Sequence, residues 1–212
     1  MTTILIKDSY ALYRDGMQKF LSDLFLNNYC ENVNFLFEFN IENIQKADII
    51  MMEYCKGEAL ICTPELMSRK RSVIIGITNE NYHAKSIFPN CISDIVFIER
   101  GGDLGEISQQ IIMQWESFKM GRRIDCYRSC STCQRVKISK KQLAVMSNIH
   151  HGHSIKEIAS LYDLSYKTIF SNKYNVMKKF MLQSDYELLV FLNRLSERDL
   201  LLRPGLVPGC NL

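Results

Sequence analysis

Hydrophobic residues in the first half of the chain recur as short runs that alternate with amphipathic stretches. Residues 13–25 place Met17, Phe20, Leu21 and Leu24 on one face of a helix. Four other runs have the length and composition of buried strands: residues 4–6, 49–52, 73–77 and 95–98. This alternation predicts an α/β fold with a parallel sheet that is covered by helices on both faces.

The residues after position 137 instead carry four successive helix signals. A serine precedes each predicted helix, and three of the four serines have Gln or Glu three residues later, which is the capping-box spacing. These pairs are Ser139 with Gln142, Ser154 with Glu157, and Ser184 with Glu187, while Ser165 stands alone. The apolar positions expected to face inward are Val145, Met146, Ile149, Ile158, Ala159, Tyr162, Ile169, Val176, Phe180, Leu188, Leu189 and Leu192. The second and third helices are joined by the very short link at positions 163–164, which predicts a helix-turn-helix in an all-α domain.

The helix predicted at residues 165–180 has an open face opposite its apolar stripe. The side chains expected on that face are Tyr166, Lys167, Phe170, Ser171, Lys173, Tyr174 and Lys178. Cations suit phosphates and polar groups suit base edges, so this combination favours a helix that enters the major groove of DNA. A solvated helix in a small bundle is the alternative interpretation.

The charge of the chain is distributed unevenly. Residues 119–180 hold thirteen Lys or Arg against three acidic residues, a balance of +10, whereas residues 1–118 hold ten against sixteen, a balance of −6. A basic segment behind an acidic one indicates a polyanionic partner for the second half. The apolar content of 47% is that of a globular protein. No stretch approaches the roughly 20 apolar residues of a membrane helix, and no signal peptide is visible, so we expect a cytoplasmic location.

The second half resembles the LuxR-type DNA-binding domain, also called the NarL/FixJ type. The resemblance is ungapped and includes Ile138, Ser139, Gly152, Ser154, residues 156–159, Ser165, residues 167–169, Asn175, Val176, Lys179, Glu187 and Leu188. It implies a four-helix domain whose third helix enters the major groove, usually as a dimer. It also implies base contacts by Phe170, Ser171 and Tyr174, and phosphate contacts by Lys156, Lys167, Thr168 and Lys178. Phe170 and Asn172 depart from the family, which usually has Lys and His at these positions.

The first half resembles a response-regulator receiver domain, a flavodoxin-like fold that takes phosphate on an aspartate and binds magnesium beside it. Of the receiver's pocket residues, Asp8 and Thr78 match. Ser9 replaces the second acidic residue and Glu53 stands in the phospho-acceptor position, while Glu99 or Arg100 takes the lysine position. A neutral hydroxyl is a poor magnesium ligand, so the resemblance implies a degenerate receiver without phosphotransfer. Glu53 is then either a fixed mimic of a phosphoaspartate or a drifted position in a domain kept for dimerisation.

Three cysteines, Cys126, Cys130 and Cys133, lie between the two halves at the spacing C-x3-C-x2-C. This spacing is that of radical enzymes that use S-adenosylmethionine, but too little chain remains beside the DNA-binding domain for the barrel of such enzymes. Zinc binding or redox sensing by thiols near arginines is a second interpretation. Reduced, unligated thiols in a polar linker are the third.

Together these patterns predict residues 1–118 as a degenerate receiver-like domain, 119–137 as a basic linker, 138–196 as the DNA-binding domain and 197–212 as a tail. The predicted function is a phosphorylation-independent transcription regulator that binds double-stranded DNA as a homodimer, or as a heterodimer with another regulator. The rival is an accessory regulator that heterodimerises and contributes little direct DNA contact. We expect no enzymatic activity, no cofactor and no membrane partner.

Overall fold

The chain is described from a computed structural model, which covers residues 1–79, 88–121, 133 and 136–201. It divides into two compact units, and each unit is treated separately below. The first comprises Met1–Tyr54, Thr63–Ser86 and Asn90–Ser129, and the second comprises Cys55–Cys62, Ile87–Pro89 and Cys130–Leu212. Most of the predicted linker and of the predicted tail lies outside the described residues.

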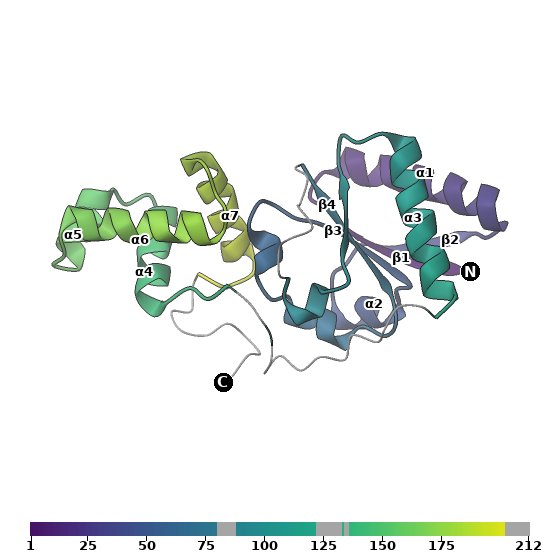
Figure 1. Ribbon diagram of the computed structural model, residues 1–212, viewed down its shortest axis with the longest axis horizontal. Helices are drawn as coiled ribbons and strands as arrows, with labels where there is room; N and C mark the ends of the chain where they lie inside the picture. The colour runs from purple at the N-terminus through teal and green to yellow at the C-terminus, as the bar shows by residue number, and fades with distance from the viewer. Residues whose placement is uncertain (80–87, 122–132, 134–135, 202–212) are drawn as a thin grey trace. The chain divides into compact units, whose positions relative to one another are not determined.

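A five-stranded parallel sheet forms the centre of the first unit (Figure 1). Its strands are β1 (Thr2–Lys7), β2 (Val33–Leu36), β3 (Ile49–Glu53), β4 (Val73–Thr78) and β5 (Val96–Glu99). Their order is β2-β1-β3-β4-β5, with every neighbouring pair parallel. β4 is buried along its whole length, as expected for a central strand that is covered on both faces. The predicted parallel sheet is confirmed, and β2 is a strand that the sequence patterns did not reveal.

Within the described residues, three α-helices accompany this sheet: α1 (Ala11–Tyr29), α2 (Ile41–Lys46) and α3 (Leu104–Lys119). Short 3-10 turns lie at η2 (Pro64–Ser68) and η3 (Asn90–Ile92). Side chains of α1 and α3 share one hydrophobic core with the sheet. Within that core the ring of Trp115 lies 5.6 Å from Phe25 and 5.2 Å from Phe118, measured between ring centroids. α1 extends beyond both ends of the predicted helix and is followed by the cap residue Cys30, whose φ of 53° is left-handed.

The part of the second unit that the structure describes contains four α-helices: α4 (Lys140–His150), α5 (Ile155–Leu161), α6 (Tyr166–Lys179) and α7 (Asp185–Glu197). Each begins after the predicted serine. Ser139 and Ser154 form complete capping boxes with their partners three residues later. Ser165 and Ser184 accept hydrogen bonds from the backbone N–H groups of Thr168 and Glu187. These side chains satisfy N–H groups that a helix leaves without a partner in its first turn, and they thereby fix where each helix starts.

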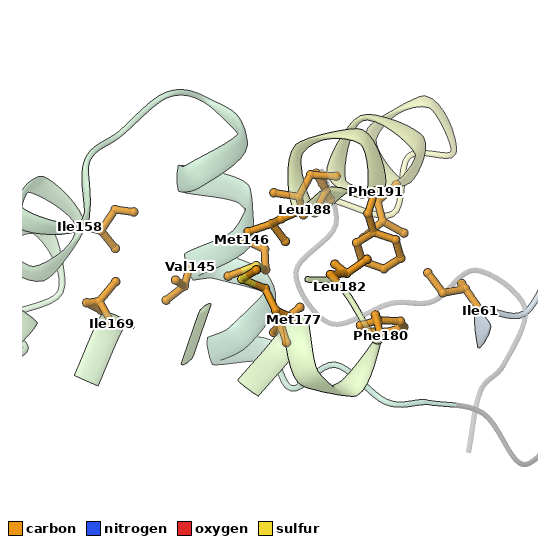
Figure 2. Packing of buried hydrophobic residues seen from close by; sticks show 14 of the residues in the cluster. Ile61, Val145, Met146, Ile158, Ile169, Met177, Phe180, Leu182, Leu188 and Phe191 are labelled. Atoms are coloured by element: carbon orange, nitrogen blue, oxygen red, sulfur yellow. The ribbon is translucent and has the colours of Figure 1, made fainter. Parts of the chain in front are cut away.

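The core of the second unit is formed where these helices meet (Figure 2). The rings of Phe180 and Phe191 pack with centroids 4.6 Å apart, and both side chains are fully buried. Leu60 and Ile61, from the segment Cys55–Cys62 that contains η1 (Glu58–Leu60), also belong to this core. The predicted inward positions at the centre of α4, α5 and α6 are confirmed as buried: Val145, Met146, Ile158, Ala159, Ile169, Val176 and Phe180.

Two apolar positions of this unit were predicted to face inward and do not. Leu189 is 47% exposed, while its neighbours in the stripe, Leu188 and Leu192, are buried. Tyr162 is 40% exposed and accepts a hydrogen bond from the Asn148 amide at 3.0 Å. Leu188 and Leu189 are about 100° apart around the helix. Because only a narrow strip of α7 packs against the core, Leu188 is buried and Leu189 stays in solvent. Tyr162 follows the last residue of α5, where the polar tip of a tyrosine favours the surface.

Candidate nucleic-acid interface and receiver-like pocket

The turn between α5 and α6 is tight and internally bonded. Tyr162 closes α5, and Asp163 takes a left-handed conformation with φ of 50°. The backbone N–H of Leu164 then donates to the carbonyl oxygen of Ala159 at 2.9 Å, and Ser165 caps α6. An αL residue at a helix end allows the chain to reverse within a few residues. The predicted short connection is confirmed, and it gives α5 and α6 the arrangement of a helix-turn-helix.

One side of α6 is sealed against the core and the opposite side is open. Ile169, Val176 and Phe180 are fully buried, as the sequence predicts. The predicted DNA-contacting residues that are exposed on α6 are Tyr166, Lys167, Phe170, Ser171, Tyr174 and Lys178, and Lys156 is exposed on α5. Cationic, hydroxyl and aromatic groups therefore share one accessible face, which is the chemistry that a DNA duplex requires of a recognition helix.

Two of the predicted DNA-contacting residues are engaged within the domain. The ammonium group of Lys173 lies 2.6 and 2.7 Å from the two carboxylate oxygens of Asp185, and the Lys173 side chain is only 15% exposed. Thr168 is half-buried, and its hydroxyl lies 2.8 Å from the hydroxyl of Ser165. The amide of Asn172 donates to the Thr168 carbonyl oxygen at 2.8 Å. The charge of Lys173 is thus balanced by Asp185 instead of being presented with Lys167 and Lys178.

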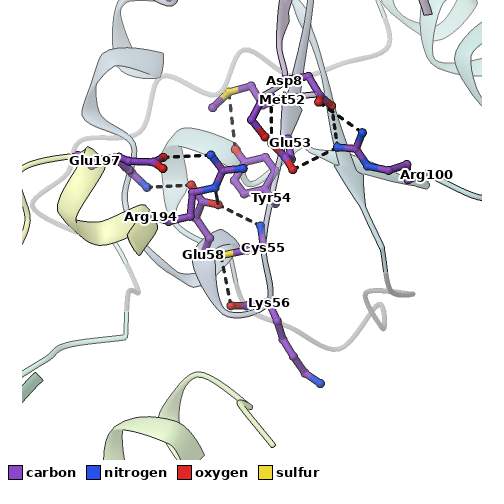
Figure 3. Close-up of polar contacts among 12 residues, drawn as sticks. Asp8, Met52, Glu53, Tyr54, Cys55, Lys56, Glu58, Arg100, Arg194 and Glu197 are labelled. Carbon is purple, nitrogen blue, oxygen red and sulfur yellow. Dashed lines mark hydrogen bonds and ion pairs between the residues drawn. The ribbon is translucent and has the colours of Figure 1, made fainter. Parts of the chain in front are cut away.

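The first unit has a cluster of polar side chains at the carboxyl edge of its sheet, where ligands bind in parallel α/β sheets (Figure 3). Asp8 follows β1 and Glu53 ends β3, while Thr78 ends β4 and Arg100 follows β5. The side chain of Asp8 is fully buried, that of Glu53 is 13% exposed and that of Arg100 is 17% exposed. We call these residues, together with Ser9, the receiver-like pocket.

Arg100 supplies the positive charge at the centre of the receiver-like pocket. One guanidinium nitrogen lies 2.8 Å from one Asp8 carboxylate oxygen and 3.2 Å from Glu53 Oε1, and a second lies 3.4 Å from the other Asp8 oxygen (Figure 3). The guanidinium group also lies over the rings of Tyr13 at 4.1 Å and Tyr10 at 4.8 Å. Glu99 is exposed on β5. Of the two residues that sequence alignment left open for the lysine position, Arg100 is the one that reaches the pocket.

The remaining oxygens of the receiver-like pocket are bonded to nearby groups. Both the backbone N–H and the hydroxyl of Ser9 donate to Glu53 Oε2, at 3.2 and 2.6 Å. The Tyr10 N–H donates to Asp8 at 2.8 Å. Thr78 is buried, and its carbonyl oxygen accepts from the Arg100 N–H at 2.8 Å. Asp8 and Glu53 therefore share the single positive charge of Arg100, and N–H and O–H donors of the chain bond to their other oxygens.

Tyr13 lines the same pocket, and its burial raises the pKa of the phenol above its usual value. The charge of Arg100 opposes this pKa shift and that of Asp8 reinforces it. The Tyr13 hydroxyl is buried and has no hydrogen-bond partner among the described residues. Tyr13 therefore stays neutral, and its ring serves as a face against which the Arg100 guanidinium packs.

The cysteine cluster is only partly visible. Cys126 and Cys130 lie outside the described residues, and Cys133 is half-buried. In the described parts of the chain, no group of three or more His, Cys, Asp or Glu side chains is arranged to hold a metal ion. The choice between a metal site, a redox sensor and unligated thiols at Cys126, Cys130 and Cys133 therefore stays open.

Of the helices in the described ranges, none is both long and apolar enough to cross a bilayer.

The helical unit matches a known family. The model of the family described as bacterial regulatory proteins, luxR family, matches residues 136–192. This span is a LuxR-family helix-turn-helix domain. The match covers α4, α5, α6 and most of α7, and it supports the predicted class of protein, a DNA-binding transcription regulator. No curated protein is significantly similar to the chain in sequence.

Solved structures of the response regulator RcsB share the fold of both units. A structure of the two-component response regulator RcsB with DNA is 19% identical, covers 91% of this chain and 98% of that chain, and has a TM-score of 0.51. RcsB from Salmonella enterica serovar Typhimurium bound to the promoter P1flhDC with the phosphomimetic BeF3− is 18% identical in sequence and has a TM-score of 0.55. The match covers 90% of this chain and 97% of that chain. A structure of two RcsB dimers on two parallel DNAs is 21% identical in sequence and has a TM-score of 0.50. The match covers 91% of this chain and 98% of that chain. The predicted fold class, a receiver-like parallel sheet followed by a helix-turn-helix domain, is confirmed.

Proposed function

We propose that the chain is a sequence-specific DNA-binding transcription regulator that reads the major groove with α6 and works without phosphorylation. The observation that supports DNA reading most directly is the exposed face of α6 within a LuxR-family domain. Lys156, Lys167 and Lys178 are exposed and would neutralise phosphates. Ser171 and Tyr174 project from the same face and would contact base edges.

The phosphate contacts make binding sensitive to salt. Each neutralised phosphate releases counterions, so three lysines in each domain give a slope of about −2.7 in log affinity against log salt concentration. A dimer that places two domains on DNA doubles this slope to about −5. The RcsB structures contain DNA and, in one case, dimers, which supports the same mode of action for this chain.

Independence from phosphorylation is supported by the receiver-like pocket. Arg100 already forms ion pairs with both Asp8 and Glu53, so a cation of the chain itself is bound to the two carboxylates that could otherwise attract magnesium. Glu53 is longer than an aspartate by one methylene, and its outer oxygen accepts two hydrogen bonds from Ser9. We interpret Glu53 as part of a fixed ionic network, which favours the drifted position over the permanent mimic of a phosphoaspartate.

An accessory regulator that heterodimerises with another regulator is the second candidate function. It is favoured by the pairing of Lys173 with Asp185, which removes one cation from the DNA-facing side. It is also favoured by exposed apolar side chains of the first unit, among them Leu12 on α1, which is 88% exposed, and Met113 on α3, which is 67% exposed. Exposed apolar groups on a soluble domain are candidate subunit contacts. DNA binding by the purified protein alone, compared with binding after a second regulator is added, separates the two functions.

A binding experiment with the full-length protein tests the proposed residue functions. Lys167→Ala should weaken binding by a similar factor on every duplex, because a phosphate contact carries no sequence information. Ser171→Ala and Tyr174→Ala should change the ranking of duplexes, because base contacts are worth about 1–3 kcal/mol each. Lys19→Ala is the matched control, since Lys19 is an exposed lysine of α1 in the other unit. Equal losses for all three α6 variants on all duplexes would show that these residue functions are wrongly assigned.

A small phosphodonor tests the second half of the proposal. Incubation with acetyl phosphate and Mg²⁺ should leave the mass of the protein and its DNA affinity unchanged. A phosphorylated species in the mass spectrum, accompanied by altered affinity, would contradict independence from phosphorylation while leaving DNA binding intact.

A further inference from the structure

Three large aromatic side chains stand in solvent along α6. Tyr166 is 51% exposed, Phe170 is 48% exposed and Tyr174 is 60% exposed. They succeed one another at intervals of four residues. An isolated exposed ring needs no explanation, but three in register on one helix form a continuous apolar surface. We call Tyr166, Phe170 and Tyr174 the aromatic row.

Helix geometry gives the aromatic row its shape. Four residues advance about 6 Å along the axis and about 40° around it, so the row is about 12 Å long and curves only slightly. The rings of Tyr166 and Phe170 stack with centroids 6.2 Å apart and an interplanar angle of 23°. Lys167, Ser171 and Lys178 run beside the row on the same exposed face. Aromatic and polar groups therefore approach a partner together.

The charge around the aromatic row selects an anionic partner. The sequence of α6 contains four lysines and no acidic residue. Lys173, the lysine on the other side of the row, is paired with Asp185, so Phe170 is not flanked by a free cation there. The partner must therefore carry negative charge beside Lys167 and Lys178 and apolar groups against the rings. The major groove of DNA offers this combination, since each thymine places a C5 methyl group among base edges that are bordered by phosphates.

Building on the proposed function, we propose that the aromatic row recognises thymine C5 methyl groups, with Phe170 as the principal specificity-determining residue. Phe170 has no polar side-chain atom, so it can discriminate between bases only by apolar contact. Tyr166 and Tyr174 add ring surface, and their hydroxyls can still bond to a base edge, a phosphate or water. A row of about 12 Å spans about four base-pair steps of 3.4 Å, so the methyl groups should fall within a window of that size in each half-site.

Replacing thymine by uracil tests this proposal, because the two bases differ only in the C5 methyl group. Duplexes bound by the full-length protein are first selected from a randomised library, and single thymines are then replaced by deoxyuridine. Removing a methyl group that the aromatic row contacts should weaken binding about four-fold, the factor expected for one buried methyl-sized group. In Phe170→Ala the thymine and uracil duplexes should bind equally at those positions. Tyr186→Ala, which removes another exposed ring from α7, is the control and should keep the four-fold difference.

The outcomes separate this proposal from the one on which it rests. Loss of uracil sensitivity in Phe170→Ala, with retention in Tyr186→Ala, supports methyl recognition. Selected duplexes that bind equally with thymine or uracil overturn methyl recognition but leave DNA reading intact, and they direct attention to a protein partner for the aromatic row. If no duplex is enriched over the starting library, the proposed function fails and methyl recognition fails with it. Circular dichroism of both variants confirms that each is folded.

Discussion

The ionic network of the receiver-like pocket gives a quantitative prediction for the stability of the first unit. In Arg100→Ala, the Asp8 and Glu53 carboxylates lose the guanidinium with which both form ion pairs, and Asp8 is fully buried. Removing one partner of a buried ion pair costs about 3–5 kcal/mol, because the remaining charge is left unpaired. Arg100 and Glu53 retain a little exposure, so we expect a loss of about 3 kcal/mol, near the lower end of that range.

The charge origin of this loss is tested with a second substitution. Asp8→Asn in the Arg100→Ala background removes the stranded charge, so the double variant should regain about 1–2 kcal/mol over Arg100→Ala. Mg²⁺ should stabilise Arg100→Ala as well, because the two carboxylates then take up a cation from solution. At 10 mM Mg²⁺ and a dissociation constant of about 1 mM, this stabilisation is about 1.4 kcal/mol. The unsubstituted protein should not respond, since Arg100 already occupies the position between the carboxylates.

Trp115 provides the assay. It is the single tryptophan of the chain, it belongs to α3 and it is 5% exposed, so its fluorescence follows the unfolding of the first unit. Urea titrations should show a lower midpoint for Arg100→Ala with an unchanged slope, because the surface exposed on unfolding is the same. A loss below about 1 kcal/mol would refute the reasoning, because a value that small is typical of an ion pair at the solvent-exposed surface. Further destabilisation on adding Asp8→Asn would also refute it.

Two further predictions concern the helical unit. The pKa of Glu157 is held below its usual value by hydrogen bonds from Ser154, whose N–H donates to the carboxylate at 2.7 Å. These hydrogen bonds stabilise the folded protein above the pKa of about 4.5 that Glu157 has in the unfolded chain. The stabilisation is lost as the pH falls through the lower pKa of the folded state. Glu157→Gln should therefore reduce the change in urea midpoint between pH 7 and pH 3. Phe180→Ala should destabilise the unit by about 3–5 kcal/mol, because it leaves a cavity at a fully buried site against Phe191. Unfolding followed by far-UV circular dichroism measures this loss. Phe170→Ala should change the stability little, because Phe170 is exposed.

The local signals in the sequence were sufficient for most of the fold. A serine cap acts within one turn of the helix that it precedes, so the four serines, three of them with Gln or Glu three residues later, located the start of all four helices of the second unit. Long apolar runs such as that of β4 identified the central strands, because burial on both faces leaves no polar alternation. β2 escaped because it has only four residues, none of them fully buried. The prediction that Leu189 faces inward was wrong, because the sequence has apolar residues at the adjacent positions 188 and 189 and does not show which of the two packs against the core.

The candidate sites were predictable to different extents. The exposed face of α6 follows from helical periodicity once the inward residues are known. The pairing of Lys173 with Asp185 was not visible, because it joins two helices and depends on their packing. The ionic network of Arg100, Asp8 and Glu53 depends in the same way on strand order. Three strand ends that are distant in sequence become neighbours only when the sheet is assembled, although the resemblance to a receiver did identify Asp8 and Glu53 as residues to inspect.

A guanidinium that is encoded in the chain has a consequence for how such a regulator is controlled. A metal ion or a phosphoryl group can come and go within seconds, whereas Arg100 is present from the moment the polypeptide is made. On the proposed function, the cell adjusts occupancy of the target promoters through synthesis and turnover of the protein, so output follows gene dosage and proteolysis more closely than the activity of any sensor kinase.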